Sequence, residues 1–204
     1  MNRSFVIAVL VIGLLAGAIV AITVREAPAP VEPRAATVLP APAPLPDFEL
    51  IDHTGEARTR SLFEGRWHLV FFGFTQCPDI CPTTLATLSS ATGALAEQGF
   101  DAVPQIVLVS VDPDRDTPER LAEYIAHFGE GNIALTGDID ALRELTEPLY
   151  IYFRKVPLEE NNYTIDHSSV VLLINPEGEF HALFSGPIRS DDLVNDLPVI
   201  LGGA

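Results

Sequence analysis

The stretch that decides the fold is FFGFTQCPDICPTTL (residues 71–85), in which a run of apolar residues leads into two closely spaced cysteines. The segment HLVFFGF (68–74) predicts a strand that is buried on both faces of a sheet. Cys77 and Cys81 follow it and are the only cysteines in the chain. Because Pro82 suits the first position of a helix, we expect a helix to begin there, with Cys81 as its N-cap.

Strand and helix patterns alternate through the rest of the chain. QIVLVSV (105–111) predicts a second buried strand after the cysteine helix, which makes a β-α-β unit with parallel strands. TPERLAEYIAHFG (117–129) predicts a helix. Further expected elements are a strand pair over 48–60, a helix opened by Asp138 and closed by Pro148, a hairpin of 169–174 and 180–184, and a helix over 190–200. This order predicts an α/β, thioredoxin-like domain with an N-terminal β-hairpin extension.

The N-terminal part predicts a membrane anchor and a linker. Residues 5–24 carry no charge and are long enough for one transmembrane helix, whereas a cleaved secretory signal has a shorter apolar region. We therefore expect an anchor over residues 1–26, a Pro/Ala-rich tether over 27–46 and the thioredoxin-like domain over 47–204. The charge pattern around the apolar run favours export of the domain, which implies the bacterial inner membrane with the soluble domain in the periplasm.

The net charge of the chain is −16, with 12 basic against 28 acidic side chains. Nucleic-acid binding needs clustered Lys and Arg and is not expected of such a chain. The acidic surface either keeps the domain soluble or suits a cationic partner.

The cysteine pair is open to three interpretations: a structural disulfide, a redox-active dithiol or two legs of a metal site. A disulfide between residues only four apart restricts the unfolded chain little, so stabilisation is a weak reason for it. The start of a helix favours thiolate over thiol, and the thiolate is both the nucleophile and the metal ligand. We therefore expect Cys77 and Cys81 to carry chemistry.

A third ligand is expected from the histidines. His167 precedes the buried strand 169–174, whose approach in a thioredoxin-like sheet passes close to the cysteine loop, although a simple strand-end role also fits. Two thiolates and one imidazole suit copper, whereas zinc normally takes a fourth ligand. A structural or solvent-facing role is expected for the other four histidines, which are His53, His68, His127 and His181.

Three motifs carry a resemblance to a known family. With FFGFTQCPDICPTTL (71–85), VSVDPDRDTPERLAEY (109–124) and DHSSVVLLINPEG (166–178), the chain resembles the Sco family, also called SenC or PrrC-like. These are membrane-tethered copper chaperones of cytochrome c oxidase assembly. The resemblance implies Cu(I) or Cu(II) bound by Cys77, Cys81 and His167. It also implies the copper-site subunit of the oxidase as a partner, and a periplasmic copper donor is a further expected partner.

Two other functions use the same fold. A membrane-tethered thiol-disulfide oxidoreductase would use Cys77 and Cys81 as a catalytic dithiol and would not need His167. A peroxidase of the peroxiredoxin type ranks last, because the pattern Pro-x-x-x-Thr-x-x-Cys is not reproduced around Cys77.

The acidic stretch DPDRD (112–116) resembles a calcium-binding loop. Thr117 stands where such a loop requires glycine, and a capped helix starts there, so calcium is rejected. We expect these acids to shape the loop beside the site or to face a partner.

Overall fold

The computed structural model describes residues 32–159 and 162–202, together with Asn2, Phe5, Ile7, Gly13 and Leu14. The chain divides into two compact units, residues 1–31 and 32–204, and the second unit contains the features described below. The transmembrane helix expected within residues 1–26 falls almost entirely outside the described residues. Among the residues that are described, no helix is long and apolar enough to cross a bilayer.

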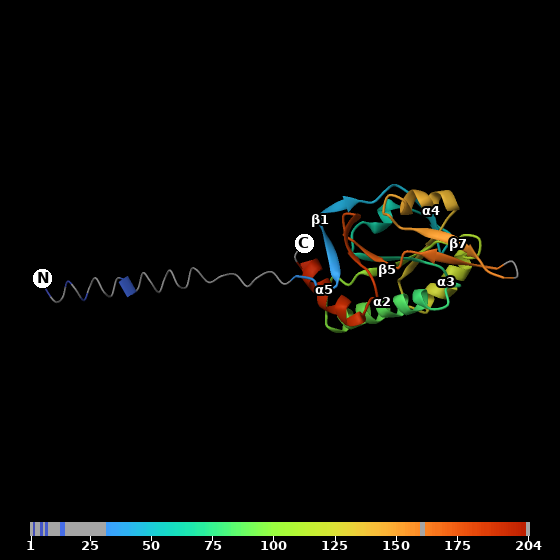
Figure 1. Ribbon diagram of the computed structural model, residues 1–204. Helices are drawn as coiled ribbons and strands as arrows, with labels where there is room; N and C mark the ends of the chain where they lie inside the picture. The colour runs from blue at the N-terminus through green and yellow to red at the C-terminus, as the bar shows by residue number, and fades with distance from the viewer. Residues whose placement is uncertain are drawn as a thin grey trace. The chain divides into compact units, whose positions relative to one another are not determined.

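The second unit is a mixed sheet with helices on both faces. Its strands are β1 (Ala36–Pro44), β2 (Glu49–Asp52), β3 (Ala57–Thr59), β4 (His68–Gly73), β5 (Gln105–Ser110), β6 (Ile133–Thr136), β7 (Phe153–Pro157), β8 (Tyr163–His167), β9 (Val171–Ile174) and β10 (Glu179–Phe184). Its helices are η1 (Arg60–Phe63), α2 (Ile80–Glu97), α3 (Pro118–Ala126), α4 (Ile139–Thr146) and α5 (Ser190–Gly202). In Figure 1, α2, α3 and α5 lie along one side of the sheet and α4 lies on the other.

Eight strands form the main sheet in the order β1-β10-β9-β4-β5-β6-β2-β3, and β7 pairs with β8 in a separate two-stranded sheet. The central strand β4 runs parallel to β5 and antiparallel to β9, with Val70 opposite both Val107 and Leu172. All six residues of β4 are buried, because neighbouring strands cover its edges and helices cover its faces. The predicted β-α-β unit and the predicted N-terminal hairpin, now β2 and β3, are both confirmed.

The tether predicted over residues 27–46 is wrong for residues 36–44, which form β1 at the edge of the main sheet. β1 pairs antiparallel with β10 from Ala36 to Pro44, with a register shift between Val38 and Ala43. Proline cannot donate a ladder hydrogen bond, but an edge strand tolerates it because one side of the strand has no partner strand. A Pro/Ala-rich sequence is therefore compatible with an edge strand as well as with a linker.

A buried carboxylate fixes the start of β1. Asp196, which is 2% exposed on α5, accepts hydrogen bonds from the backbone N–H groups of Arg34, Ala35 and Ala36 at 2.8, 2.7 and 2.9 Å. A carboxylate is rarely buried unless its oxygens are paired, and these three donors satisfy it. The chain therefore enters the domain at a fixed point.

Replacing Asp196 with Ala is expected to lower the free energy of unfolding by about 3 kcal/mol, because hydrogen bonds to a charged group contribute about 1.5–3 kcal/mol and are not additive. Urea unfolding followed by the fluorescence of Trp67, the only tryptophan, measures the change. Asp191→Ala is the control, since this side chain lies exposed on the same helix and should cost less than about 1 kcal/mol. Equal losses in the two variants would show that Asp196 has no special role.

Candidate functional site

The cysteines lie between the end of β4 and the first turn of α2. Cys77 is in the connecting loop, and its N–H donates to the carbonyl of Phe74 at 3.3 Å. The N-cap of α2 is Asp79, so the expectation of Cys81 as N-cap is wrong by two residues. Pro82 is tolerated inside the first turn because its missing N–H would have had no partner within the helix there.

Gly73, the last residue of β4, leaves room for the buried sulfur. A β-carbon at this position would lie 2.9 Å from Sγ of Cys81 and 2.9 Å from the ring of Phe71. Real β-carbons do not approach other heavy atoms so closely, and Cys81 is 0% exposed with little freedom to move. A side chain at residue 73 would therefore displace the thiol.

The two free thiols have different acidities. Sγ of Cys77 accepts a hydrogen bond from the N–H of Cys81 at 3.4 Å. The Cys81 thiol, together with backbone N–H groups, lowers the pKa of Cys77 to about 4, although burial opposes the effect. The same contact with Cys77, together with burial, raises the pKa of Cys81 above the ordinary range. Cys77 is therefore the thiolate of the pair at neutral pH.

His167 ends β8 and is directed by the two-stranded sheet, whose register places Phe153 opposite it. Its Nδ1 lies 3.0 Å from the carbonyl oxygen of Ser168, which can only accept, so Nδ1 carries the proton. Nε2 then has a free lone pair, and it lies 3.5 Å from Sγ of Cys81. The rings of Phe74 and Phe71 stand edge-on to the imidazole at 5.8 and 6.1 Å.

The structure brings the three predicted residues together across 86 positions of sequence: two Sγ atoms and one histidine nitrogen all lie within 4.8 Å of one another. A hollow of about 350 Å³ opens beside them, lined by Cys77 and His167 with neighbours from the loop and from β8. The site therefore has three soft or borderline donors and one open side. Such a set can hold a soft metal ion or can attack a disulfide.

The other four histidines have different surroundings, as expected. His53 accepts the N–H of Ala134 on its Nδ1 at 3.2 Å, and Nδ1 of His127 lies 2.7 Å from the carbonyl of Glu123 on its own helix. His68 is buried within β4, and the ring of His181 stands edge-on to Trp67.

The acidic loop 112–116 holds the cysteine side of the site. The buried carboxylate of Asp116 accepts hydrogen bonds from the N–H and the hydroxyl of Thr75 at 2.9 and 2.5 Å, and from the hydroxyl of Ser110 at 2.6 Å. Thr75 stands two residues before Cys77. Asp116 therefore fixes the path of the cysteine loop relative to the end of β5.

The same loop holds the histidine side. Buried Asp112 pairs with Arg115 at 2.5 Å and accepts the hydroxyl of Tyr163 at 2.7 Å. Arg115 lies 3.7 Å from the centroid of the Tyr163 ring and donates to the Tyr163 carbonyl at 2.9 Å and to the side chain of Gln76 at 3.0 Å. Tyr163 begins β8, and His167 ends it. The prediction that the acids shape the loop beside the site is confirmed.

Thr75, Arg115 and Tyr163 were not identified from the sequence. The alternating aspartates of DPDRD (112–116) could have indicated such partners, because closely spaced carboxylates that become buried need hydrogen-bond donors from other segments. The sequence did not show which segments would supply those donors.

Comparison with known proteins finds one matching family model and several similar sequences. A family model described as SCO1/SenC matches residues 37–201. A "putative copper-binding protein" of Stutzerimonas stutzeri is 37% identical over 164 residues, which cover 80% of this chain and 80% of that protein. The human mitochondrial SCO2 homolog is 39% identical over 152 residues, which cover 74% of this chain and 56% of that protein.

Solved structures agree with the fold. The crystal structure of Arabidopsis thaliana ScoI with copper bound has a TM-score of 0.75 and 31% identity, covering 79% of this chain and 100% of that one. Yeast Sco1 with copper bound has a TM-score of 0.73 and 28% identity, covering 80% of this chain and 91% of that one. The predicted thioredoxin-like α/β fold is confirmed by these matches.

The different acidities of the thiols predict different reactivities in the reduced, metal-free protein. Because the Cys77 pKa is about 4, its thiolate persists as the pH falls from 8 to 5, and its alkylation by iodoacetamide should change little over this range. An ordinary cysteine loses about tenfold in rate for each pH unit below its pKa of about 8.5. Peptide mapping by mass spectrometry gives the rate for each cysteine.

Cys81→Ala is the informative variant for this measurement, because it removes the thiol that stabilises the Cys77 thiolate, whereas a serine hydroxyl would still donate a hydrogen bond. Alkylation of Cys77 in the variant should become slower near pH 6 than in the unsubstituted protein. The assignment fails if Cys81 is alkylated faster than Cys77 under native conditions.

Tyr163→Phe removes the hydroxyl that Asp112 accepts and should lower the free energy of unfolding by about 1 kcal/mol or more, because a buried carboxylate loses a donor. The nitrogen NMR signals of the His167 ring should also shift, because Tyr163 fixes β8. Tyr150→Phe is the matched control, since Tyr150 is 94% exposed and should change neither quantity. Unchanged His167 signals in Tyr163→Phe would disprove the link between loop and histidine.

Proposed function

This chain belongs to the SCO1/SenC family, and from that membership and its Cys77, Cys81 and His167 cluster we propose that it binds one copper ion as cargo and assists maturation of the binuclear copper site of cytochrome c oxidase. The observation that carries the proposal is the convergence of two sulfurs and one imidazole nitrogen within 4.8 Å. Similar proteins support it, because one is described as a putative copper-binding protein and two Sco structures contain copper.

The donor set fits copper. Thiolates favour Cu(I), and imidazole together with thiolate accommodates Cu(II), so one site can hold the ion in either oxidation state. Nδ1 of His167 donates to a backbone carbonyl, which leaves Nε2 as the ligand atom and fixes the plane of the ring. A structural zinc site would be completed by a fourth protein ligand, and the described residues offer three in this cluster.

The open side of the site suits transfer. Cys81 is buried against Gly73, whereas Cys77 and His167 line the hollow of about 350 Å³. A ligand from a partner protein can enter through this hollow and displace the protein's own donors one at a time. Cys77 already exists as thiolate, so its bond to the ion forms without prior loss of a proton.

The proposal also covers the membrane anchoring, the compartment and the partner proteins of the chain. Residues 1–26 anchor it in the bacterial inner membrane, and the soluble domain lies in the periplasm, where a copper donor loads it and the copper-site subunit of the oxidase receives the ion. The length and lack of charge of residues 5–24 support the anchor.

A second candidate function is reduction of the disulfide between the two copper-site cysteines of the oxidase subunit. The Cys77 thiolate would attack one sulfur of that disulfide to give a mixed disulfide, and the Cys81 thiolate, once its proton is lost, would then displace the subunit's sulfur. The subunit leaves as a dithiol, and this chain leaves with a Cys77–Cys81 disulfide. The observation in favour is the pairing of an acidic thiol at the hollow with a buried thiol of high pKa.

Copper titration tests the proposal. The full-length chain, reduced under anaerobic conditions, is titrated with Cu(I) against a chromophoric competitor and with Cu(II) by visible absorption, and one copper per chain is expected. His167→Ala should weaken binding by more than about tenfold, because even residues that only orient a ligand account for about 10- to 100-fold. His127→Ala is the control, since His127 lies on α3 and contacts its own helix.

The same variants separate the two functions. A copper chaperone needs all three residues, whereas a thiol reductase keeps its disulfide exchange in His167→Ala and loses it in Cys77→Ser. Unchanged copper affinity and spectrum in His167→Ala would rule out the three-ligand site.

A further inference from the structure

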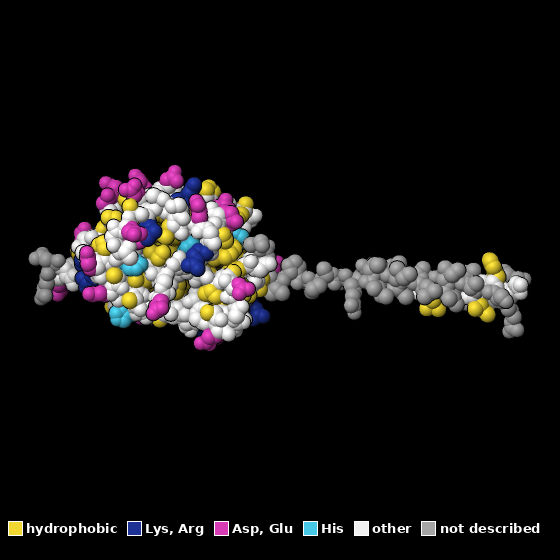
Figure 2. Space-filling model, turned by 180° about the vertical axis from the view of Figure 1, so that it is seen from behind, with side chains coloured by type: hydrophobic (Ala, Val, Ile, Leu, Met, Phe, Trp, Pro, Cys, Tyr) yellow, Lys and Arg dark blue, Asp and Glu magenta, His cyan; other side chains and the backbone are white. Residues whose placement is uncertain are grey.

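A second hollow lies beside the two-stranded sheet that carries His167. Its volume is about 370 Å³, and it is lined by Val111, Asp114, Ile139, Arg143, Phe153, Arg154 and Lys155. Three of these residues are basic and one is acidic, in a chain that has 12 basic against 28 acidic side chains. Figure 2 shows how few basic side chains lie among the acidic ones on one face of the molecule. A hollow with a positive lining is therefore an exception on this surface.

Two of its cations are not neutralised. Lys155 forms an ion pair with Asp114, but neither Arg143 nor Arg154 forms an ion pair with any residue in 32–159 or 162–202. Asp166 is opposite Arg154 in the β7–β8 register, yet the two side chains do not pair. Arginine is the residue best suited to bidentate binding of carboxylates, and these two guanidinium groups are exposed.

The turn that leaves α4 adds exposed aromatic side chains. Tyr150 is 94% exposed and has a φ of 56°, in the left-handed region that favours glycine. Helices commonly end with glycine in this conformation, because a side chain with a β-carbon is strained there. A large aromatic side chain that gains no burial does not repay this strain within the fold, so Tyr150 points to a role outside it.

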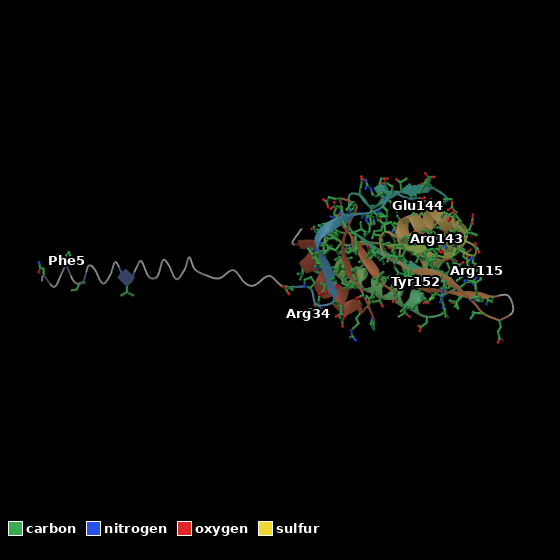
Figure 3. The ribbon with its side chains drawn as sticks, turned by 45° about the horizontal axis from the view of Figure 1, so that its top comes forward. Phe5, Arg34, Arg115, Arg143, Glu144 and Tyr152 are labelled. Atoms are coloured by element: carbon green, nitrogen blue, oxygen red, sulfur yellow. The ribbon has the colours of Figure 1, made fainter. Side chains whose placement is uncertain are left out.

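The segment that bears Tyr150, Tyr152 and Arg154 pairs with the strand that ends at His167, the proposed copper ligand. Tyr152 is half-exposed and exchanges hydrogen bonds with Ser168: the N–H of Tyr152 donates to the Ser168 hydroxyl at 3.0 Å, and the N–H of Ser168 donates to the Tyr152 carbonyl at 2.9 Å. Phe153 lines the hollow and stands opposite His167 in register. Figure 3 shows Arg143 and Tyr152 on the part of the domain that also bears Arg115.

We propose that Arg143, Tyr150, Tyr152 and Arg154, around the hollow of about 370 Å³, dock an acidic segment of the protein that receives the copper. The inference rests on the proposed function, because it names the surface chemistry of the acceptor. Carboxylates of the acceptor pair with the two arginines, and an apolar side chain fits against Ile139 and Phe153. Tyrosine and arginine are the residues most enriched at the centres of protein interfaces.

Charge favours a protein segment over an anionic lipid surface. The net charge of −16 repels a negatively charged membrane over most of the chain, whereas a short acidic segment meets a hollow lined by three basic side chains and one acidic one. The hollow is concave and partly apolar, which fits a peptide with side chains of both kinds.

The test measures docking in the absence of copper. The probe is the soluble copper-site domain of the oxidase subunit, reduced and metal-free, and its affinity for the reduced full-length chain in neutral detergent is measured at several salt concentrations. The variant Arg143→Gln with Arg154→Gln should weaken binding by about tenfold and flatten its salt dependence. The matched control is Arg34→Gln with Arg189→Gln, which removes the same charge; Figure 3 shows Arg34 beside β1. The control should change affinity less than about twofold.

Tyr150→Gly gives a second, independent measurement. It relieves the left-handed strain, so the variant should be no less stable to urea than the unsubstituted chain, while its affinity for the acceptor domain should fall several-fold. A loss of binding without a loss of stability would locate Tyr150 at the interface.

Three results would overturn the proposal. The first is equal weakening of binding by the two double-arginine variants, and the second is no binding by the unsubstituted chain. The third is binding to phosphatidylserine vesicles that needs Arg143 and Arg154, while binding to the acceptor domain does not need them. Copper titration of the same variants separates this proposal from the proposed function. A chain that binds copper but does not dock disproves only the docking surface, and a chain that docks without binding copper disproves only the copper site.

Discussion

Two buried carboxylates on one loop hold the candidate site together. Asp116 accepts donors from the cysteine loop, and Asp112 accepts donors from the start of β8 and from Arg115. Because a buried carboxylate is stable only when its oxygens are satisfied, a large displacement of either contacting segment would remove donors that these charges need. The distance between the cysteines and His167 therefore depends on a loop that contributes no ligand of its own.

The arrangement joins a rigid half to an adjustable half. Cys81 is fixed by α2 and by the absent side chain of Gly73, and both belong to the central layer of the domain. His167 belongs to a two-stranded sheet outside the main one, which rests on the domain through Tyr163 and Arg115. Small isolated hairpins have little stability of their own, so small shifts of the histidine are less costly than shifts of the cysteines. A site that must first hold and then release an ion benefits from one ligand that can move.

The sequence was sufficient for the elements whose signals are local. The fully apolar run of β4, the capping residues Thr117 and Asp138, and the turn before β10 each predicted an element that the structure contains. β1, β6, β7 and β8 were missed, because their partners decide them: β6 pairs with β5 and β2, and β1 depends on Asp196, about 160 residues away. The cluster of Cys77, Cys81 and His167 was predictable, because the chain has only two cysteines and the strand order of a thioredoxin-like sheet brings the start of β9 close to them. The contacts between Arg115 and Tyr163 were not predictable, since they join residues that are 48 positions apart in the sequence.

The early start of β1 limits how far the domain can travel. If residues 1–26 are held in a membrane, only residues 27–33 remain between the anchor and the first residue that Asp196 fixes, which is Arg34. At no more than about 3.6 Å per residue, this segment reaches roughly 25 Å, less than half the reach of a linker that continued to residue 46. A short tether of this kind would raise the local concentration of the domain around any membrane protein that it contacts.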